Sequence, residues 1–275
     1  VCNMIKKIIL FGALLAAALF ASAQETDIQE NARATRLDTE FVNEYTTPAR
    51  VMLSDGGVVG TENLLRPYCG QVSTNEPNVC VFRNGKDGRS SVLLDFGKEI
   101  HGGIQIVRAM SADKAAARFR ICFGESVSEA LSNVGDAGTT ATNEHSVRDF
   151  EIFVPWLGSA EYGNTGFRFM RLELLGEDTE ALLVAVRAVS RYRDIPYVGQ
   201  FKCSDERLNQ IWQTGAYTVH LNMQDYLWDG IKRDRLVWIG DMHPEVMAVN
   251  TVFGNHKVVQ KSLDYVRNST PPTVW

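Results

Sequence analysis

The stretch Phe167-Arg168-Phe169-Met170-Arg171-Leu172-Glu173-Leu174 alternates apolar and charged side chains along most of its length. Successive side chains of a strand point to opposite faces, so this alternation is typical of a strand with one buried face. Similar β-rich runs occur between clusters of Gly, Asp and Asn, which mark turns. Many short strands separated by turns predict a β-sandwich or jelly roll. We expect strands at residues 91–96, 103–108, 117–123, 149–154, 166–175 and 182–189, with further strands and long loops in residues 24–90.

The hydrophobic period changes from strand-like to helical after Gly199. Ser204 can cap a helix, and Asp205 and Glu206 favour the positive end of its dipole. Pro244 can occupy the first turn of a second helix, because its missing N–H is unpaired there anyway. The sequence therefore predicts a β-sandwich domain, residues 24–198, followed by a helical domain, residues 199–275. Helical faces are predicted from Leu208, Ile211, Trp212, Gly215 and Val219, from Val246, Met247, Asn250 and Phe253, and from Val259, Leu263 and Val266.

The first residues have the three parts of a secretory signal peptide. Lys6 and Lys7 precede the apolar run 8–20, and Ala21-Ser22-Ala23 follows it. The alternative, a retained membrane anchor, is disfavoured because the run is short and ends in small residues. We expect a signal peptide at residues 1–23, a secreted or periplasmic protein, and no stable membrane insertion after cleavage.

Composition narrows the class of protein. The chain has 275 residues, 28 basic and 33 acidic side chains, a net charge of −5 and 45% hydrophobic residues. This apolar content can build a core, which excludes disorder of the whole chain. The acidic balance disfavours nucleic acid as a partner, and a single apolar run excludes a multi-span membrane protein.

Four cysteines follow the predicted cleavage site: Cys69, Cys80, Cys122 and Cys203. An exported protein can oxidise them, and Cys69 and Cys80 flank a turn-rich stretch, so either a bridge between these two or four free thiols fits the sequence. The His residues are scattered and no Cys-x-x-Cys pair occurs, so we expect no zinc site. No cofactor is implied.

The densest group of chemically useful side chains lies at residues 228–245, between two predicted helices. Three aspartates, two arginines and two tryptophans fall within residues 228–241. Trp faces stack on sugar rings, and a carboxyl group near an apolar ring can have a raised pKa and act as a general acid. Composition alone also fits a solvated, salt-bridged turn in which the tryptophans are core and Asp241 caps the next helix.

The order of residues in this stretch resembles the signature of the inverting α-L-rhamnosidases built on an (α/α)₆ barrel, roughly Asp-x-x-x-Arg-Glu/Asp-Arg-Leu-x-Trp-x-Gly-Asp. Every defined position from Asp229 to Asp241 is filled. Residues 94–103, 123–126 and 166–169 resemble segments of the β-sandwich that precedes the barrel in that family. The resemblance covers roughly residues 90–275 and implies a β-sandwich followed by the first helices of an incomplete barrel.

The resemblance also implies roles for individual side chains. Asp234 would be the general acid that protonates the departing glycosidic oxygen. Asp229 and Asp241 would bind rhamnose hydroxyls, Arg233 would hold hydroxyls and tune nearby carboxylates, and Trp238 would form an apolar wall beside the sugar. Many members have Glu where this chain has the shorter Asp234, which sets the proton about one methylene further back.

Four other side chains have weaker claims to a role. His243 can be a subsite residue or a structural one. Glu245 fits a first-turn helix carboxylate, stabilised by the helix dipole. His101, beside two glycines, fits a turn residue packed at the domain interface, and Glu125 fits a structural carboxylate at a strand end.

Inverting hydrolysis needs a second carboxylate to activate water, about 6.5–9.5 Å from the acid. The resemblance implies that this base is a Glu far downstream, and we expect the present chain to be a fragment that lacks it.

Three functions remain open. The first is an exported α-L-rhamnosidase acting on rhamnose-containing oligosaccharides, polysaccharides or glycosides. The others are a non-catalytic carbohydrate-binding module and a related barrel glycosidase of other sugar specificity.

Overall fold

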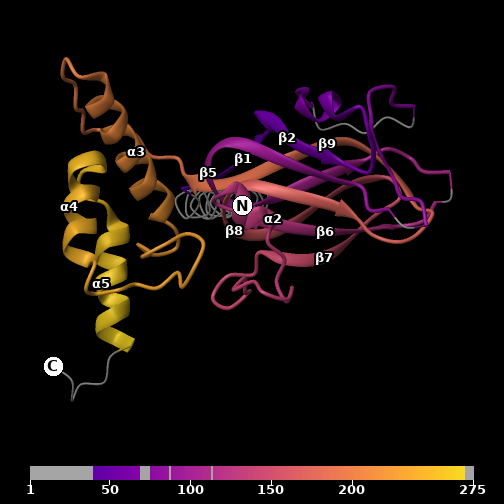
Figure 1. The fold of residues 1–275 in the computed structure, drawn as a ribbon. Coiled ribbons are helices and arrows are strands. Elements are labelled where there is room, and N and C mark those ends of the chain that lie inside the picture. The colour runs from indigo at the N-terminus through magenta and orange to yellow at the C-terminus, as the bar shows by residue number, and fades with distance from the viewer. Residues whose placement is uncertain (1–39, 69–74, 87, 113, 270–275) are drawn as a thin grey trace, which may run out of the picture. The chain divides into compact units, whose positions relative to one another are not determined.

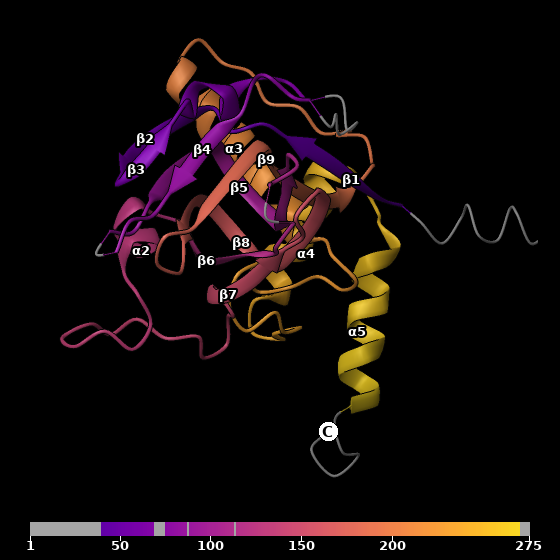
Figure 2. The same cartoon turned by 90° about the vertical axis from the view of Figure 1, so that its right-hand side faces the viewer.

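The computed structural model describes residues 40–68, 75–86, 88–112 and 114–269. The described residues from Val42 onward form one compact unit, in which the three long helices follow the strands along the chain. Figure 1 shows α3, α4 and α5 grouped together, apart from the strands; in Figure 2, turned by 90°, α3 and α4 appear behind the strands. The predicted signal peptide and Cys69 lie outside the described residues. The predicted fold class, a β-sandwich followed by helices, is confirmed.

The elements follow one another in this order. They are β1 Phe41–Thr46, β2 Arg50–Asp55, β3 Gly57–Val59, the 3₁₀ helix η1 Thr61–Leu65, β4 Cys80–Arg83, β5 Ser91–Arg108, β6 Ala117–Gly124, α2 Val127–Leu131, β7 Asp149–Val154, β8 Gly158–Leu174, β9 Glu180–Arg193, α3 Glu206–Asn222, α4 Met242–Phe253 and α5 Lys257–Ser269.

Strand β5 organises the sheet, whose order is β3-β4-β9-β5-β8-β6-β7. Its first half, to Asp95, pairs with β2, and its second half, from Gly102, pairs with β9. The ladder between β5 and β8 is broken between Asp95 and Ile100 and again after Gly102. Such breaks bend a strand, so its two halves can lie in different layers. The strands predicted at 91–96 and 103–108 are therefore one bent strand.

The core of the sandwich lies between the inward faces of these strands. Phe82 and Phe119 meet edge to face with ring centroids 5.7 Å apart, and Phe96 and Phe167 do the same. Aromatic pairs favour this arrangement because the positive edge of one ring meets the negative face of the other. From residues 167–174, the core of the sandwich contains Phe167, Met170, Leu172 and Leu174.

Asp95 gives the Asp-Phe-Gly segment a structural role. Its carboxylate is buried and accepts hydrogen bonds from Arg168 Nε at 2.8 Å, from Arg50 Nη2 at 2.7 Å and from the amide of Gly97 at 2.8 Å. These donors hold the pKa of Asp95 well below its usual range. Gly97 has φ +84°, which favours glycine, so the segment forms the bulge in β5.

The three long helices appear where the period predicted them, but a cap and all three apolar faces need correction. Asp205, not Ser204, is the N-cap of α3, because its carboxylate accepts the amide hydrogen of Arg207 at 2.9 Å. The predicted apolar face of α3 is also displaced: Leu208 and Ile211 are exposed, while Asn209, Ala216, His220 and Leu221 are buried. On α4, Met247 and Asn250 are exposed, and on α5, Leu263 is exposed.

Side-chain and backbone hydrogen bonds connect the end of β9, and the segment after it, to the helices. Arg193 Nε donates to the carbonyl of Met223 at 2.9 Å, and the carbonyl of Arg193 lies 2.6 Å from His220 Nε2. The amides of Val198 and Gly199 both donate to the carbonyl of Val252, at 2.8 and 2.9 Å. A division into domains at residues 198 and 199 stays a prediction.

The described cysteines are free thiols. Cys80 and Cys122 are buried in the sandwich, and Cys203 is half-buried before α3. Burial raises the pKa of Cys80 to about 12, which keeps this thiol protonated. In the described part of the chain no helix has the length and apolar character needed to span a bilayer.

Candidate active site

The loop between α3 and α4, here called the acid loop (residues 223–241), carries the predicted signature. Asp229 and Leu236 join two parts of this loop through two hydrogen bonds. The amide of Asp229 donates to the carbonyl of Leu236 at 3.0 Å, and Asp229 Oδ1 accepts from the amide of Leu236 at 2.9 Å. One carboxylate oxygen of Asp229 therefore shapes the loop. A role in sugar binding would fall to the other oxygen.

The acid loop is seated on the sandwich through a glycine. Ile231 is buried, and a Cβ at Gly166 in β8 would lie only 2.7 Å from Ile231 Cγ1 and 3.0 Å from Lys232 Cβ. Only a residue without a side chain admits the loop at this distance. Trp228 packs edge to face on His101 of β5, with ring centroids 5.4 Å apart. His101 thus packs against the acid loop, and it lies in strand β5 and not in the turn that we expected.

Two cations of the acid loop also face the sandwich. Lys232 Nζ lies 2.7 Å from a Glu129 oxygen and 3.0 Å from a Glu125 oxygen. Arg235 donates to the carbonyl of Asn164 and lies over the Trp228 ring at 5.7 Å. The alternative of a salt-bridged turn is correct for Lys232. Arg235 has no ion pair among the described residues and holds the loop through a carbonyl and a ring instead.

Asp234 makes contact with the sandwich through a histidine. His145 Nδ1 lies 2.5 Å from Asp234 Oδ1, and Arg233 Nε lies 3.3 Å from Asp234 Oδ2. Asp234, Arg235 and His145 have φ of 63°, 54° and 62°. Left-handed backbone is costly for residues other than glycine and clusters at functional sites. The loop thus holds Asp234 in a strained, doubly contacted position.

Asp241, Asp229 and Glu245 form a second acidic group at the start of α4. The pKa of Glu245 is raised to about 7, first by burial and then by the charges of Asp241 and Asp229. Its Oε2 atom is buried and has no hydrogen-bond partner. Asp241 stands at the N-cap but makes no side-chain cap bond, so the capping alternative for Asp241 is wrong. Glu245 was expected to be a first-turn carboxylate stabilised by the helix dipole, but its raised pKa shows that its charged form is disfavoured.

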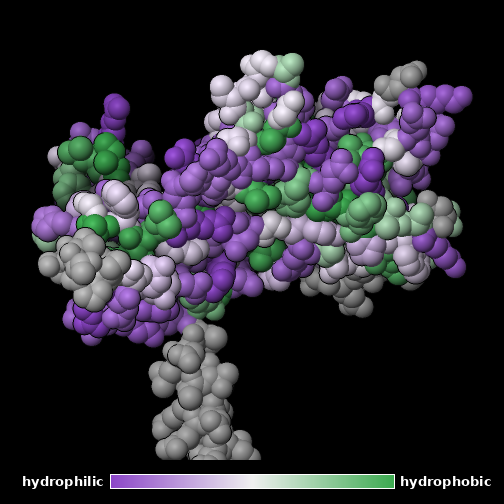
Figure 3. Space-filling view, turned by 90° about the horizontal axis from the view of Figure 1, so that it is seen from below, coloured by the Kyte–Doolittle hydropathy of each residue, from purple (hydrophilic) through white to green (hydrophobic). Residues whose placement is uncertain are grey.

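The remaining predicted site residues are exposed. Trp238 is 56% exposed. Its indole packs on Gly240, where an added Cβ would lie only 2.8 Å from the indole nitrogen. His243 is exposed in the first turn of α4. Leu236 and Ile239 are exposed beside Trp238. Figure 3 shows hydrophobic side chains on the surface of the helical part, among hydrophilic ones.

Buried ionisable groups of β5 lie behind the acid loop. Burial raises the pKa of Glu99 to about 8, helped by Glu125 and opposed by Lys232. Burial lowers the pKa of His101 to about 4, because the charged ring cannot be solvated there. Tyr217 of α3 donates to the carbonyl of Glu99 at 2.5 Å. No local pattern singles out Glu99, because its environment is made by distant segments.

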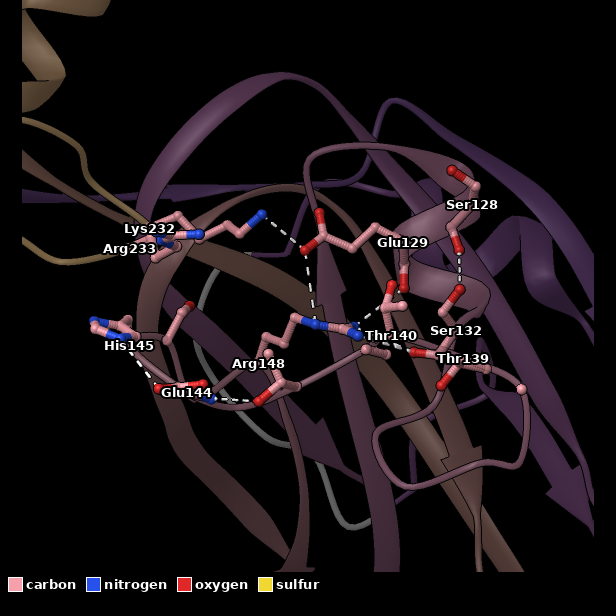
Figure 4. Close-up of a pocket in the computed structure, with 14 residues that line it drawn as sticks. Ser128, Glu129, Ser132, Thr139, Thr140, Glu144, His145, Arg148, Lys232 and Arg233 are labelled. Atoms are coloured by element: carbon pink, nitrogen blue, oxygen red, sulfur yellow. Dashed lines mark hydrogen bonds and ion pairs between the residues drawn. The ribbon is translucent and has the colours of Figure 1, made fainter.

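His145 is the residue that sequence reasoning missed. It belongs to the loop between α2 and β7, far from the signature, and nothing in its neighbours Glu144 and Ser146 marks it. Figure 4 shows it beside a hollow that is also lined by Lys232 and Arg233 of the acid loop. The structure thus brings Asp234, Arg233 and His145 together, while Asp229 and Asp241 gather around Glu245.

Residues 196–273 match the family model described as the bacterial α-L-rhamnosidase six-hairpin glycosidase domain. A curated α-L-rhamnosidase from Formosa agariphila is 22% identical over 202 residues, which are 70% of this chain and 20% of that protein. The chain thus spans about one fifth of the length of this relative.

Solved rhamnosidase structures share the fold. The Klebsiella oxytoca rhamnosidase with rhamnose bound has a TM-score of 0.62 at 18% identity, over 81% of this chain and 43% of that one. The family GH78 rhamnosidase of Bacillus sp. GL1 has a TM-score of 0.57 at 22% identity, over 76% and 20%. The resemblance to the α-L-rhamnosidases drawn from the loop motif is therefore confirmed, and residues 196–273 are the part of the chain that carries the six-hairpin glycosidase match.

Proposed function

We propose that this chain is part of an exported α-L-rhamnosidase that removes terminal α-L-rhamnose from glycans or glycosides with inversion. The match of residues 196–273 to the six-hairpin glycosidase model supports the hydrolase activity. The basic and apolar segments of residues 1–23 support export, to the periplasm or the medium.

Asp234 is the general acid in this proposal, and its contact with His145 is the observation that carries it. His145 Nδ1 lies within hydrogen-bonding distance of Asp234 Oδ1, at 2.5 Å, so the imidazole can hold the carboxyl group in the orientation from which it gives its proton to the glycosidic oxygen. Glu144 Oε1, 3.5 Å from His145 Nε2, extends the same chain of groups.

The reaction would run in one displacement. Asp234 gives its proton to the bridging oxygen as the bond from that oxygen to the anomeric carbon breaks. Water forms the new bond from the opposite face and loses a proton to a second carboxylate, about 6.5–9.5 Å from the first. That carboxylate is proposed to be a Glu in the part of the six-hairpin domain that this chain does not cover.

The sugar would be held by the other residues of the signature. Asp229 and Asp241 accept hydrogen bonds from hydroxyls, Arg233 donates them, and His243 stands at the rim. The exposed Trp238 ring offers an apolar face to the methyl group of a 6-deoxy sugar.

The whole protein with its natural continuation tests this proposal. Released rhamnose and its anomeric configuration, followed by NMR on an aryl α-L-rhamnoside, should show turnover with inversion. Asp234→Asn should remove turnover of a rhamnoside whose leaving group needs a proton, while rhamnose binding, measured by calorimetry, survives. Binding without turnover in the unaltered protein would favour a carbohydrate-binding module, and turnover of another sugar alone would favour a different barrel glycosidase.

A further inference from the structure

A hollow of about 700 Å³ lies between the acid loop and the segment from α2 to β7. This volume is within the range of about 300–1,000 Å³ that is usual for small-ligand sites. Figure 4 shows its wall: hydroxyls of α2 and of the following loop on one side, and Lys232 and Arg233 on the other. Ser128, Ser132, Thr139, Thr140 and Thr142 supply the hydroxyls.

The position of the hollow relative to Asp234 indicates whether it would hold the rhamnose or the leaving group. Both residues that hold the Asp234 carboxylate, His145 and Arg233, line the hollow. Asp229, Trp238 and Asp241, which would hold the rhamnose ring, are not among the described residues that line it. A general acid faces the oxygen that leaves with the aglycone. The hollow therefore lies where the leaving group would be.

The chemistry of the wall indicates what it could take. Its charged side chains have partners. Glu129 lies 2.7 Å from Lys232 and 3.6 Å from Arg148. Glu144 lies 3.5 Å from His145, and Arg233 lies 3.3 Å from Asp234. Arg148 also donates to the carbonyls of Glu129 and Ser132. Among the described residues of the wall none has a Phe, Tyr or Trp ring. Such a wall offers hydroxyls that donate and accept, and no surface for stacking a flat aglycone.

We propose that this hollow is the leaving-group subsite and that it takes a neutral, hydroxyl-rich sugar. This inference rests on the proposed function, since the acid role of Asp234 gives the hollow its side. It makes the natural substrate an oligosaccharide or polysaccharide, with the β-sandwich supplying most of the wall that binds the sugar next to rhamnose.

Two rhamnosides with different leaving groups test the inference in the whole protein. One carries a hexopyranose as the leaving group, and the other carries 4-nitrophenol. Thr140→Val and Ser128→Ala each remove one hydroxyl from the exposed wall. We expect kcat/KM for the hexopyranoside to fall about threefold to tenfold per hydroxyl, the effect of one hydrogen bond. We expect kcat/KM for the 4-nitrophenyl substrate to stay within about twofold, since no aryl contact is lost.

Thr218→Val is the matched control, because Thr218 is exposed on α3 and donates to the carbonyl of Thr214 outside the hollow. It should leave both substrates unchanged. Unchanged hexopyranoside cleavage in both wall variants, or an equal loss on both substrates, would overturn the inference while the proposed function stands. If the unaltered protein cleaves neither rhamnoside, the proposed function fails, and the subsite fails with it.

Discussion

His145 Nδ1 of the β-sandwich lies 2.5 Å from Asp234 Oδ1 of the acid loop. Both residues have left-handed backbone, at φ 62° and 63°, which turns each side chain toward the other at a cost in conformational energy. The side-chain exposure of Asp234 is 27% and that of His145 is 49%, so solvent and substrate can still reach the pair. A residue of the sandwich thus positions the proposed acid.

Replacing His145 tests this relationship. In the whole protein, His145→Gln should lower kcat/KM about tenfold to a hundredfold on rhamnosides with poor leaving groups, because the acid loses its partner and its orientation. A dinitrophenyl rhamnoside, whose leaving group needs little protonation, should be cleaved nearly as before.

His256→Gln serves as the control for this change. His256 precedes α5 and accepts the amide of Val258 at 3.2 Å through Nδ1, so its loss affects a helix start and not Asp234. The leaving-group dependence should therefore be unaltered. If His145→Gln slows all substrates equally, His145 is only structural.

Gly166→Ala should unseat the acid loop. The new Cβ would lie 2.7 Å from Ile231 Cγ1, a contact that real Cβ atoms essentially never make. We expect the free energy of unfolding to fall by about 1–3 kcal/mol, as for other overpacked sites. Trypsin should cleave faster after Lys232 or Arg233. Ile231→Ala in the same protein should relieve part of the loss, as a double-mutant cycle would measure.

Gly215→Ala should change the free energy of unfolding in the opposite direction. Gly215 lies within α3, where a Cβ meets nothing within 4 Å. Alanine should stabilise the helix by about 0.5–1 kcal/mol and leave trypsin cleavage of the acid loop unchanged. A stable Gly166→Ala protein with a protected loop would contradict the seating described above.

Glu245 should make stability depend on pH. Its pKa in the folded protein is about 7, against an ordinary value of 4.5, so the folded state holds a proton that the unfolded state loses as pH rises through this window. Stability is therefore lost between pH 4.5 and 7. At pH 8, Glu245→Gln should be more stable than the unaltered protein by about 1 kcal/mol, a value reduced for solvent screening, and near pH 4 the two should agree.

Urea unfolding at pH 4 and pH 8 measures this difference. Glu177→Gln, an exposed residue in the turn before β9, is the control and should show no gain at pH 8. A Glu245→Gln protein that is less stable at pH 8 would mean that the ionised carboxylate is stabilised and not strained.

Local pattern predicted the elements of this fold well, because strands and helices are set by periods of two and 3.6 residues. The alternation of Met170, Leu172 and Leu174 specified the core-facing side of β8, and the Asp205–Glu206 pair marked the start of α3. Pattern failed where tertiary packing decides. Leu208 and Ile211 share a helical face with Trp212, yet they are exposed while Asn209 and His220 are buried.

The candidate site was predictable only in its local part. The motif located Asp229, Asp234 and Asp241, and all three lie in or beside the acid loop. The partners His145, Gly166 and Glu99 come from other segments. Glu99 and Gly166 lie in segments that resemble the family, but the role of all three arises from contacts across the fold, which no local pattern shows. Glu245 was visible, but its raised pKa depends on burial that no spacing reveals.

The leaving-group dependence of Asp234→Asn in the whole protein tests the acid role of Asp234 most directly. Rates would be measured on aryl α-L-rhamnosides from methoxyphenyl to dinitrophenyl. We expect kcat/KM of Asp234→Asn to fall about 100-fold to 10,000-fold on the methoxyphenyl rhamnoside, whose leaving group needs a proton. On the dinitrophenyl rhamnoside kcat/KM should change little, because dinitrophenol leaves without one. An equal loss across the series, or no loss at all, would contradict this acid role.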